Sequence, residues 1–155
     1  MFDRATRRSV LWAGAFAAGS LFGVGSSFAQ KPLTPTPSCF VLTQNCKPIA
    51  GALLDFWHAD GSGNYDNSGF RLRGHQFTDP DGRFRLRTVV PGVYPGRTRH
   101  FHVKVQPRGG RVLTTQLYFP GEAKNRSDGL FRKELLVRTA KNEGWLAGRF
   151  DFVIG

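Results

Sequence analysis

A series of short apolar or alternating runs, separated by turn-forming residues, constrains the fold of this chain most. The runs cover residues 50–57, 83–90, 100–106, 112–119, 135–139 and 149–154. Clusters of Gly, Pro, Asn and Asp, such as Thr78-Asp79-Pro80-Asp81-Gly82, lie between them. Runs of this length are typical of β-strands, and no helical apolar period extends over eleven or more residues beyond the first 30. The sequence predicts an all-β fold, a two-sheet β-sandwich or squashed barrel with long loops, in which residues 121–131 form a surface loop.

The first 29 residues have the three parts of a cleavable export signal. A basic stretch precedes an apolar run from Val10 to about Val24, and the small residues Ser27 and Ala29 precede Gln30. The basic part, Thr6-Arg7-Arg8-Ser9-Val10-Leu11, resembles a twin-arginine signal, the type that exports folded proteins. A membrane anchor is the alternative, but this apolar run is shorter than the stretch of about 20 apolar residues that a spanning helix needs. We expect a periplasmic or secreted protein without stable membrane association once the signal is cleaved.

Residues 30–47 are predicted to be an extended lead-in, and residues 48–155 a single domain. Pro32, Pro35 and Pro37 fall within eight residues, a density that suits neither a helix nor a strand ladder. Two interpretations of Cys39 and Cys46 stay open, a disulfide favoured by an oxidising compartment or two independent thiols.

The net charge of +11 raises the question of a nucleic-acid partner. Such a partner would require Lys and Arg clusters interleaved with exposed aromatic residues, or a known docking motif, and the sequence has neither. Instead, Arg83, Arg85 and Arg87 alternate with Phe84 and Leu86, as on the solvated face of a strand. We therefore expect no nucleic-acid partner and at most a weak attraction of anionic small molecules.

The sharpest local motif is His100-Phe101-His102 within a predicted strand. Residues i and i+2 of a strand lie on one face, about 7 Å apart, so both imidazoles can converge on one metal ion. Tyr65 and Tyr94 lie in glycine-containing loop segments and would add two phenols. A set of two phenols and two imidazoles suits Fe(III) better than Zn(II). On chemistry alone, tyrosines that tether a sandwich by hydrogen bonds stay an alternative.

Five motifs carry a resemblance to a known family. In chain order they are Leu54-Asp55-Phe56-Trp57-His58-Ala59-Asp60, Gly63-Asn64-Tyr65, Arg73-Gly74-His75-Gln76-Phe77-Thr78-Asp79, Thr88-Val89-Val90-Pro91-Gly92-Val93-Tyr94-Pro95 and Arg97-Thr98-Arg99-His100-Phe101-His102. Together they resemble the intradiol dioxygenases, the family of protocatechuate and catechol dioxygenases. The resemblance runs from about residue 48 to residue 120.

The resemblance implies an enzyme with one non-haem Fe(III) as its cofactor, which cleaves a catechol-type ring with O2 to a muconate-type diacid. Its iron ligands would be Tyr65, Tyr94, His100 and His102. Tyr65 would leave when the substrate binds and accept a catechol proton, and Arg97 would stabilise negative charge on the ring. Gln116 matches a family glutamine near the oxygen pocket.

His58 and His75 match no ligand position of the family, so the sequence predicts hydrogen-bonding roles for them.

The sequence departs from the family at its start, where relatives usually carry a longer segment that helps to wall the substrate pocket. The chain passes almost directly from its proline-rich stretch into Phe40-Val41-Leu42-Thr43. An iron-binding but inactive relative therefore stays open. A non-catalytic secreted β-sandwich binding module also stays open, because the patterns Thr-Asp-x-x-Gly-x-Phe and Pro-Gly-x-Tyr occur in such modules as well. The sequence does not identify the catechol or the oligomeric state.

Overall fold

The computed structural model describes residues 38–155, so the predicted export signal and residues 30–37 of the predicted lead-in lie outside it. Along these residues the strands and 3-10 helices follow one another as β1 (Cys39–Thr43), β2 (Leu53–Trp57), β3 (Arg73–Phe77), β4 (Arg83–Phe84), β5 (His100–Gln106), β6 (Leu113–Tyr118), η2 (Ala123–Arg126), η3 (Lys133–Leu135), β7 (Arg138–Asn142), β8 (Trp145–Arg149) and β9 (Phe152–Ile154). No helix in this part of the chain is long and apolar enough to cross a bilayer.

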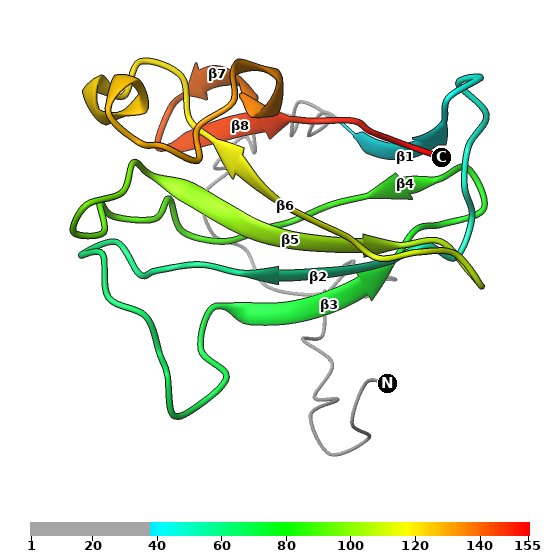
Figure 1. The fold of residues 1–155 in the computed structure, drawn as a ribbon, viewed down its shortest axis with the longest axis horizontal. Coiled ribbons are helices and arrows are strands. Elements are labelled where there is room, and N and C mark those ends of the chain that lie inside the picture. Colours follow the sequence, from blue (N-terminus) through cyan, green and yellow to red (C-terminus); the bar gives the residue numbers. More distant parts are fainter. Residues whose placement is uncertain (1–37) are drawn as a thin grey trace, which may run out of the picture.

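The strands form a four-stranded sheet, a three-stranded sheet and a hairpin. The four-stranded sheet has the order β3-β2-β5-β6 and is antiparallel throughout. In the three-stranded sheet β1 lies between β4 and β9, and it pairs with β9 in parallel. Figure 1 shows the four-stranded sheet in one layer, with β1, β7 and β8 in a second layer above it. The predicted all-β sandwich is confirmed.

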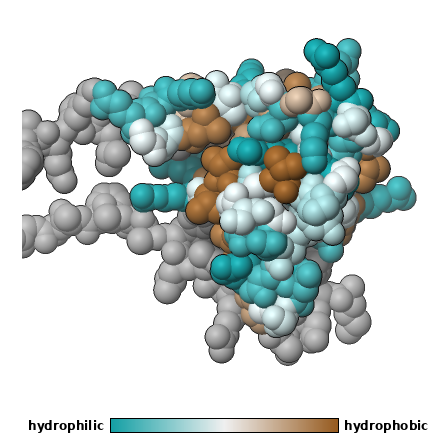
Figure 2. Space-filling view, turned by 90° about the vertical axis from the view of Figure 1, so that its left-hand side faces the viewer, coloured by the Kyte–Doolittle hydropathy of each residue, from teal (hydrophilic) through white to brown (hydrophobic). Residues whose placement is uncertain are grey.

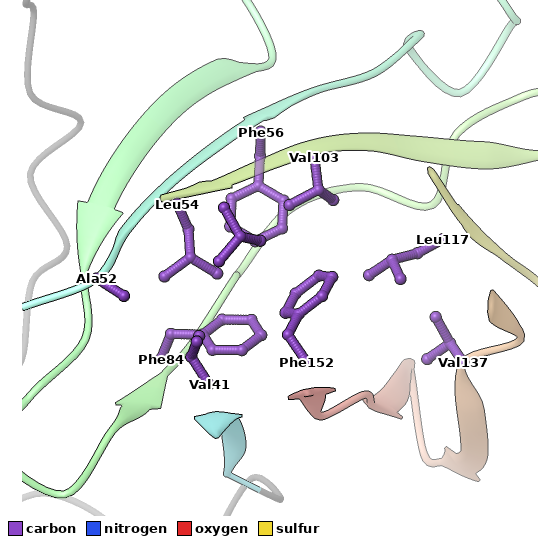
Figure 3. Close-up of a cluster of buried hydrophobic side chains, with 10 residues drawn as sticks. Val41, Ala52, Leu54, Phe56, Phe84, Val103, Leu117, Val137 and Phe152 are labelled. Atoms are coloured by element: carbon purple, nitrogen blue, oxygen red, sulfur yellow. The ribbon is translucent and has the colours of Figure 1, made fainter. Parts of the chain in front are cut away.

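The hydrophobic core lies between these layers (Figure 3). Its buried side chains come from both sheets and include Val41, Leu54, Phe56, Phe84, Val103, Leu117 and Phe152. The Phe84 ring lies 6.0 Å from that of Phe56 and 5.7 Å from that of Phe152, so three aromatic rings join the two sheets. Burial of one such side chain contributes about 1.5–3 kcal/mol.

Strand β5 has the predicted bounds, whereas the strand predicted at residues 83–90 ends at Phe84. The side-chain amide of Gln76 explains the early end. Its nitrogen donates to the Arg85 carbonyl oxygen (2.8 Å) and its oxygen accepts from the Arg85 N–H (3.2 Å). Because this amide satisfies both backbone groups of Arg85, no neighbouring strand is needed there.

Three strands lie where the sequence predicted none. Strand β1 falls within the predicted lead-in and forms the middle of a sheet, so residues 39–43 are part of the folded domain. Strands β3 and β8 lie in segments with no clear alternation of apolar residues. The segment predicted as a surface loop, 121–131, contains η2 and the buried residue Asp128, so it is only partly a surface loop.

Both cysteines are free in the structure. Cys39 is half-buried, and its sulfur accepts a hydrogen bond from the Phe150 N–H (3.5 Å). Cys46 is exposed.

Candidate metal centre

The alternation of β5 places the two predicted histidine ligands on the outer face of the four-stranded sheet. Phe101 and Val103 pack with the core, so His100 and His102 point to the opposite side. The register sets Trp57 of β2 and Gln116 of β6 on either side of His102. The Trp57 ring stacks on the His102 imidazole, with centroids 4.8 Å apart and an interplanar angle of 3°.

Three side chains from two distant segments converge at this face. The Nε2 atoms of His100 and His102 lie 3.1 Å apart, and the Tyr65 hydroxyl oxygen lies 3.4 Å and 3.1 Å from them, respectively. Two nitrogens that are each about 2.1 Å from one metal ion lie about 3 Å apart when their bonds meet at right angles. The donor set therefore fits a metal ion. Within residues 38–155 no group of three or more His, Cys, Asp or Glu side chains could hold one, so a metal here would need the phenols.

The electrostatics of the site keep both imidazoles neutral. Burial lowers the pKa of His100, whose Nδ1–H donates to the Thr98 carbonyl oxygen (2.7 Å) and leaves Nε2 as a bare acceptor. The pKa of His102 is lowered from 6.5 to about 4, first by burial, then by the repulsion that a protonated His100 would exert and by the positive charge of Arg97. Neutral imidazole is the form that binds metal ions.

Tyr94 lies at the rim of the same cavity, with 43% of its surface exposed. Its ring meets the Tyr65 ring edge to face, with centroids 5.4 Å apart. In the described part of the chain no hydrogen bond joins its hydroxyl to Tyr65, His100 or His102. The structure thus brings Tyr94 next to the other three side chains, and its role as a ligand stays a prediction.

Glycines hold the two tyrosine-bearing loops together. The Gly92 N–H donates to the Asp60 carbonyl oxygen (2.7 Å), and a Cβ at Gly92 would lie 2.3 Å from the Gly63 nitrogen. Gly63 has φ +89° and would bring a Cβ within 2.4 Å of the Val93 carbonyl oxygen. Only glycine permits this approach, which sets Tyr65 close to Tyr94.

Arg97 supplies the positive charge of the cavity. Its Nη2 donates to the Gln116 side-chain oxygen (2.6 Å), and its Nε donates to Asp128 Oδ2 (2.9 Å). Gln116 in turn lies with its amide nitrogen 3.4 Å from His102 Nδ1. The predicted residues Arg97 and Gln116 therefore lie at the site, and Gln116 contacts a predicted ligand directly.

The sequence did not single out Trp57, Tyr118 or Asp128 as site residues. The Tyr118 hydroxyl lies 2.5 Å from Gln116 Oε1 and 2.8 Å from the Leu130 carbonyl oxygen. The i, i+2 relation between Gln116 and Tyr118 on one strand was available as a signal. For Asp128, 31 residues from Arg97, the sequence offered none.

The cavity over these residues has a volume of about 490 Å³ and is lined by Gly63, Asn64, Tyr65, Asn67, Tyr94, Pro95, Arg97, His100 and His102. It lies near the end of the sandwich where β2 ends and β5 begins. Figure 2 views this end and shows hydrophilic and hydrophobic residues interspersed on it. Ligand sites commonly have volumes of about 300–1,000 Å³, so the cavity can hold a small aromatic molecule.

The histidines outside the predicted ligand set take no part in the site. His58 is buried, and its ring nitrogens bond the Ala59 carbonyl oxygen (2.7 Å) and Thr88 Oγ1 (2.8 Å), the hydrogen-bonding role that the sequence predicts. His75 lies on β3 with its ring edge to face with Phe77.

A family model described as Dioxygenase matches residues 38–154. The chain belongs to the intradiol dioxygenase family. Among curated members, it is 32% identical over 137 residues to catechol 1,2-dioxygenase 2 of Acinetobacter lwoffii, an alignment that covers 68% of this chain and 50% of the relative. It is 31% identical over 110 residues to the protocatechuate 3,4-dioxygenase beta chain of Burkholderia cepacia, covering 59% of this chain and 47% of that protein. The chain thus spans about half the length of the curated relatives that it matches.

Two solved structures show the same family fold. The dioxygenase domain of a dioxygenase carbohydrate-binding protein fusion from Streptomyces sp. SirexAA-E is 54% identical with a TM-score of 0.74, covering 78% of this chain and 82% of that one. The 3-chlorocatechol 1,2-dioxygenase of Rhodococcus opacus 1CP is 31% identical with a TM-score of 0.68, covering 75% and 57%. The family predicted from the sequence motifs is confirmed.

Proposed function

We propose that this chain is a non-haem Fe(III) intradiol dioxygenase that cleaves a catechol-type ring with O2 to a muconate-type diacid. The observation that carries the proposal is the convergence of Tyr65, His100 and His102 within 3.4 Å of one another, in a cavity that Tyr94 and Arg97 also line. Membership of the intradiol dioxygenase family supports it. The chain spans about half the length of its curated relatives, so we propose their activity for it and do not assign it by family membership alone.

Tyr65, Tyr94, His100 and His102 would hold the iron. When bound, Fe(III) would supply a Lewis-acid centre at which the substrate oxygens are oriented. The Thr98 carbonyl oxygen fixes the His100 ring through Nδ1 and aims Nε2 into the site. Trp57 stacks on His102 and limits the rotation of its imidazole. Both imidazole rings are therefore held in place before a metal ion or a substrate binds.

Tyr65 is the group that we assign to proton transfer. Burial raises the pKa of its phenol, and the positive charge of Arg97 offsets part of this increase. Without a metal the hydroxyl therefore keeps its proton at neutral pH. A trivalent cation would deprotonate it. As a phenolate, the Tyr65 oxygen could accept a proton from a catechol hydroxyl. Loops carry both tyrosines and a strand carries both histidines, so a phenolate is better placed to leave than an imidazole.

Arg97 is the group that we assign to charge stabilisation. A catechol that has lost both protons is a dianion, and Arg97 is the cation among the residues that line the cavity. Its contact with Asp128 fixes where the guanidinium lies. Preorganised charges of this kind stabilise an anionic ring without reorganisation during the reaction.

Oxygen uptake by the mature chain, loaded with iron and supplied with catechol, protocatechuate or hydroxyquinol, tests the function. We expect uptake of one O2 per ring and a diacid product that contains both oxygen atoms, measured by mass spectrometry with 18O2. Arg97→Ala should lower turnover, whereas Arg83→Ala, an exposed arginine on β4, serves as the matched control.

Each alternative predicts a different result. Coloured, iron-loaded protein that consumes no oxygen with any of the three catechols would favour an iron-binding but inactive relative. Protein that takes up no iron would favour a non-catalytic binding module and contradict the proposal.

We also propose that the enzyme works outside the cytoplasm, because residues 1–29 resemble a twin-arginine export signal. Replacing Arg7 and Arg8 together by Lys should retain the chain in the cytoplasm. Export of the variant at the wild-type level would contradict this.

A further inference from the structure

An apolar groove of about 120 Å³ lies between the segment that follows β4 and the β7–β8 hairpin. Leu86, Val89 and Val90 line it from the segment. Leu146 and Phe150 line it from β8 and the residues just after β8. Val89 and Val90 are 49% and 37% exposed, so apolar surface of the groove faces solvent. Burial of this surface would stabilise the fold.

The backbone of residues 86–90 has no strand partner within the described part of the chain. The Gln76 side chain satisfies both backbone groups of Arg85. The next backbone hydrogen bond along the chain runs from the Gly92 N–H to the Asp60 carbonyl oxygen. Between these two points no backbone hydrogen bond joins the segment to another residue of 38–155. The segment can therefore accept an extended chain beside it.

The register of β1 with β4 sets which residues would lie beside this segment. Cys39 pairs with Phe84, and the two strands are antiparallel. If the register continues, each step back from Cys39 corresponds to one step forward from Phe84. Residues 33–38 would then lie opposite residues 85–90. Cys39 also lines the groove, so the described chain begins next to it.

The alternation of β1 sets which side chains would face the groove. Val41 is buried in the core and Cys39 packs against it, so both point into the sandwich. Because side chains alternate along an extended chain, the odd-numbered positions before Cys39 would point the same way and the even-numbered positions outward. The odd-numbered positions are apolar and the even-numbered positions polar in the stretch Leu33-Thr34-Pro35-Thr36-Pro37-Ser38. The apolar residues thus match the apolar groove.

The prolines of this stretch determine how it can bind. The Val41 N–H donates to the Gly82 carbonyl oxygen (2.8 Å), so the odd-numbered N–H groups of β1 point towards β4 and its extension. Pro37 and Pro35 are in the same phase and have no N–H to donate. A regular ladder therefore cannot continue beyond Phe84, where β4 ends. Contacts in this part of the groove would be made by side chains.

We propose that residues 33–37 lie along residues 86–90 and cover the apolar groove. The side chains that enter it are Leu33, Pro35 and Pro37. Because the first residue of β1 lines the groove, this stretch is tethered next to it. A short tether gives an effective concentration on the order of 1 mM, which favours this stretch over a second copy of the chain or a free apolar molecule. The proposal does not rest on the proposed function.

Disulfide trapping in the mature chain with Cys46→Ser tests the register. Position 36 lies opposite position 87 in the continued register, and Arg87 is exposed. Thr36→Cys combined with Arg87→Cys should form an intramolecular disulfide on mild oxidation, as measured by mass spectrometry of the linked peptides. Thr36→Cys combined with Arg111→Cys is the control, because Arg111 is equally exposed but lies in the loop between β5 and β6. The control pair should stay reduced.

Three results of this experiment would overturn the proposal. The first is the absence of an intramolecular disulfide between positions 36 and 87, and the second is an equal yield in the control pair. The third is a disulfide-linked dimer, which would assign the groove to a second copy of the chain.

Two neighbouring substitutions give a second test that needs no added cysteine. Leu33→Asp places a charge at a position that faces the groove, and Thr34→Asp places the same charge at an outward position. Leu33→Asp should raise the unfolding equilibrium constant of the mature chain about tenfold, because burial of a leucine side chain is lost. Thr34→Asp should leave it at the wild-type value. Denaturant unfolding measures both, and equal values for Leu33→Asp and Thr34→Asp would overturn the proposal.

Discussion

The two faces of strand β5 differ in what holds them. On one face Val103 and Val105 are fully buried and meet apolar side chains of both sheets. On the other face His100 and His102 meet a phenol, a carbonyl oxygen and an amide, each at hydrogen-bond distance. The hydrophobic effect does not depend on the direction in which side chains meet. Hydrogen bonds do, so those to His100 and His102 fix how the two imidazoles are oriented.

This difference teaches that the stability of the fold and the proposed function depend on opposite faces of one sheet. A slip of one residue in the register of β5 would exchange the two sets of side chains. The register is fixed on both sides of the strand, by β2 and by β6, so the core determines where the histidines point. The following predictions test how separate the two faces are, from the largest expected effect to the smallest.

His102→Ala should abolish function with little effect on the fold. It removes a proposed ligand, so oxygen uptake should fall by more than the roughly 100-fold upper range for loss of a ligand's partner. Iron content should fall with it, while the unfolding midpoint of the metal-free chain stays close to that of the wild type. Full iron content and activity in the variant would remove His102 from the ligand set.

Leu54→Ala should do the reverse. Leu54 is fully buried in the core, and loss of such a side chain costs about 2–5 kcal/mol of unfolding free energy. Denaturant unfolding measures this loss, and the activity per bound iron should not change. Val153→Ala, at a position that is 55% exposed, is the control and should change stability by less than about 0.5 kcal/mol. An equal loss in both variants would contradict the assignment of the core.

The accuracy of prediction from sequence follows the same division. The core face and β5 could be predicted because alternation of apolar residues reports burial directly. Strand β3, Arg73-Gly74-His75-Gln76-Phe77, lies at the edge of its sheet and has no fully buried side chain, so it lacks that pattern. The end of β4 depends on the Gln76 side chain, which imitates a strand partner.

The site could be predicted only where its residues lie in motifs. His100 and His102 are recognisable as a pair because their spacing alone puts them on one face. Asp128 lies in a polar segment and binds Arg97 and Thr98 only when that segment folds against the start of β5. Sequence spacing carries no information about such a contact.

Tyr94→Phe should change colour more than stability. If Tyr94 is a ligand, loss of its phenolate should shift or bleach the tyrosinate-to-iron charge-transfer band of the iron-loaded chain, as measured by visible absorption. Tyr118→Phe is the control, because the Tyr118 hydroxyl contacts Gln116 and Leu130 and is outside the proposed ligand set. An unchanged spectrum in Tyr94→Phe would remove Tyr94 from that set.

The smallest expected effect is on the pH dependence of stability, which should differ between the two faces of β5. The pKa of His102 is lowered from 6.5 to about 4, so on acidification the unfolded chain takes up this proton before the folded chain does. The metal-free protein should therefore lose stability as the pH falls from 6.5 towards 4. His102→Asn should reduce the slope of this dependence, to which the lowered pKa values of His58 and His100 also contribute, whereas Leu54→Ala should lower stability equally at every pH. Equal slopes for wild type and His102→Asn would contradict the assigned shift.

Titration of the metal-free mature chain with Fe(III), followed by visible absorption, tests the central claim most directly. If Tyr65, Tyr94, His100 and His102 form one iron site on the outer face of the four-stranded sheet, a tyrosinate-to-iron band should grow and saturate at one ion per chain. A chain that stays colourless and binds no iron at any point of the titration would contradict the claim.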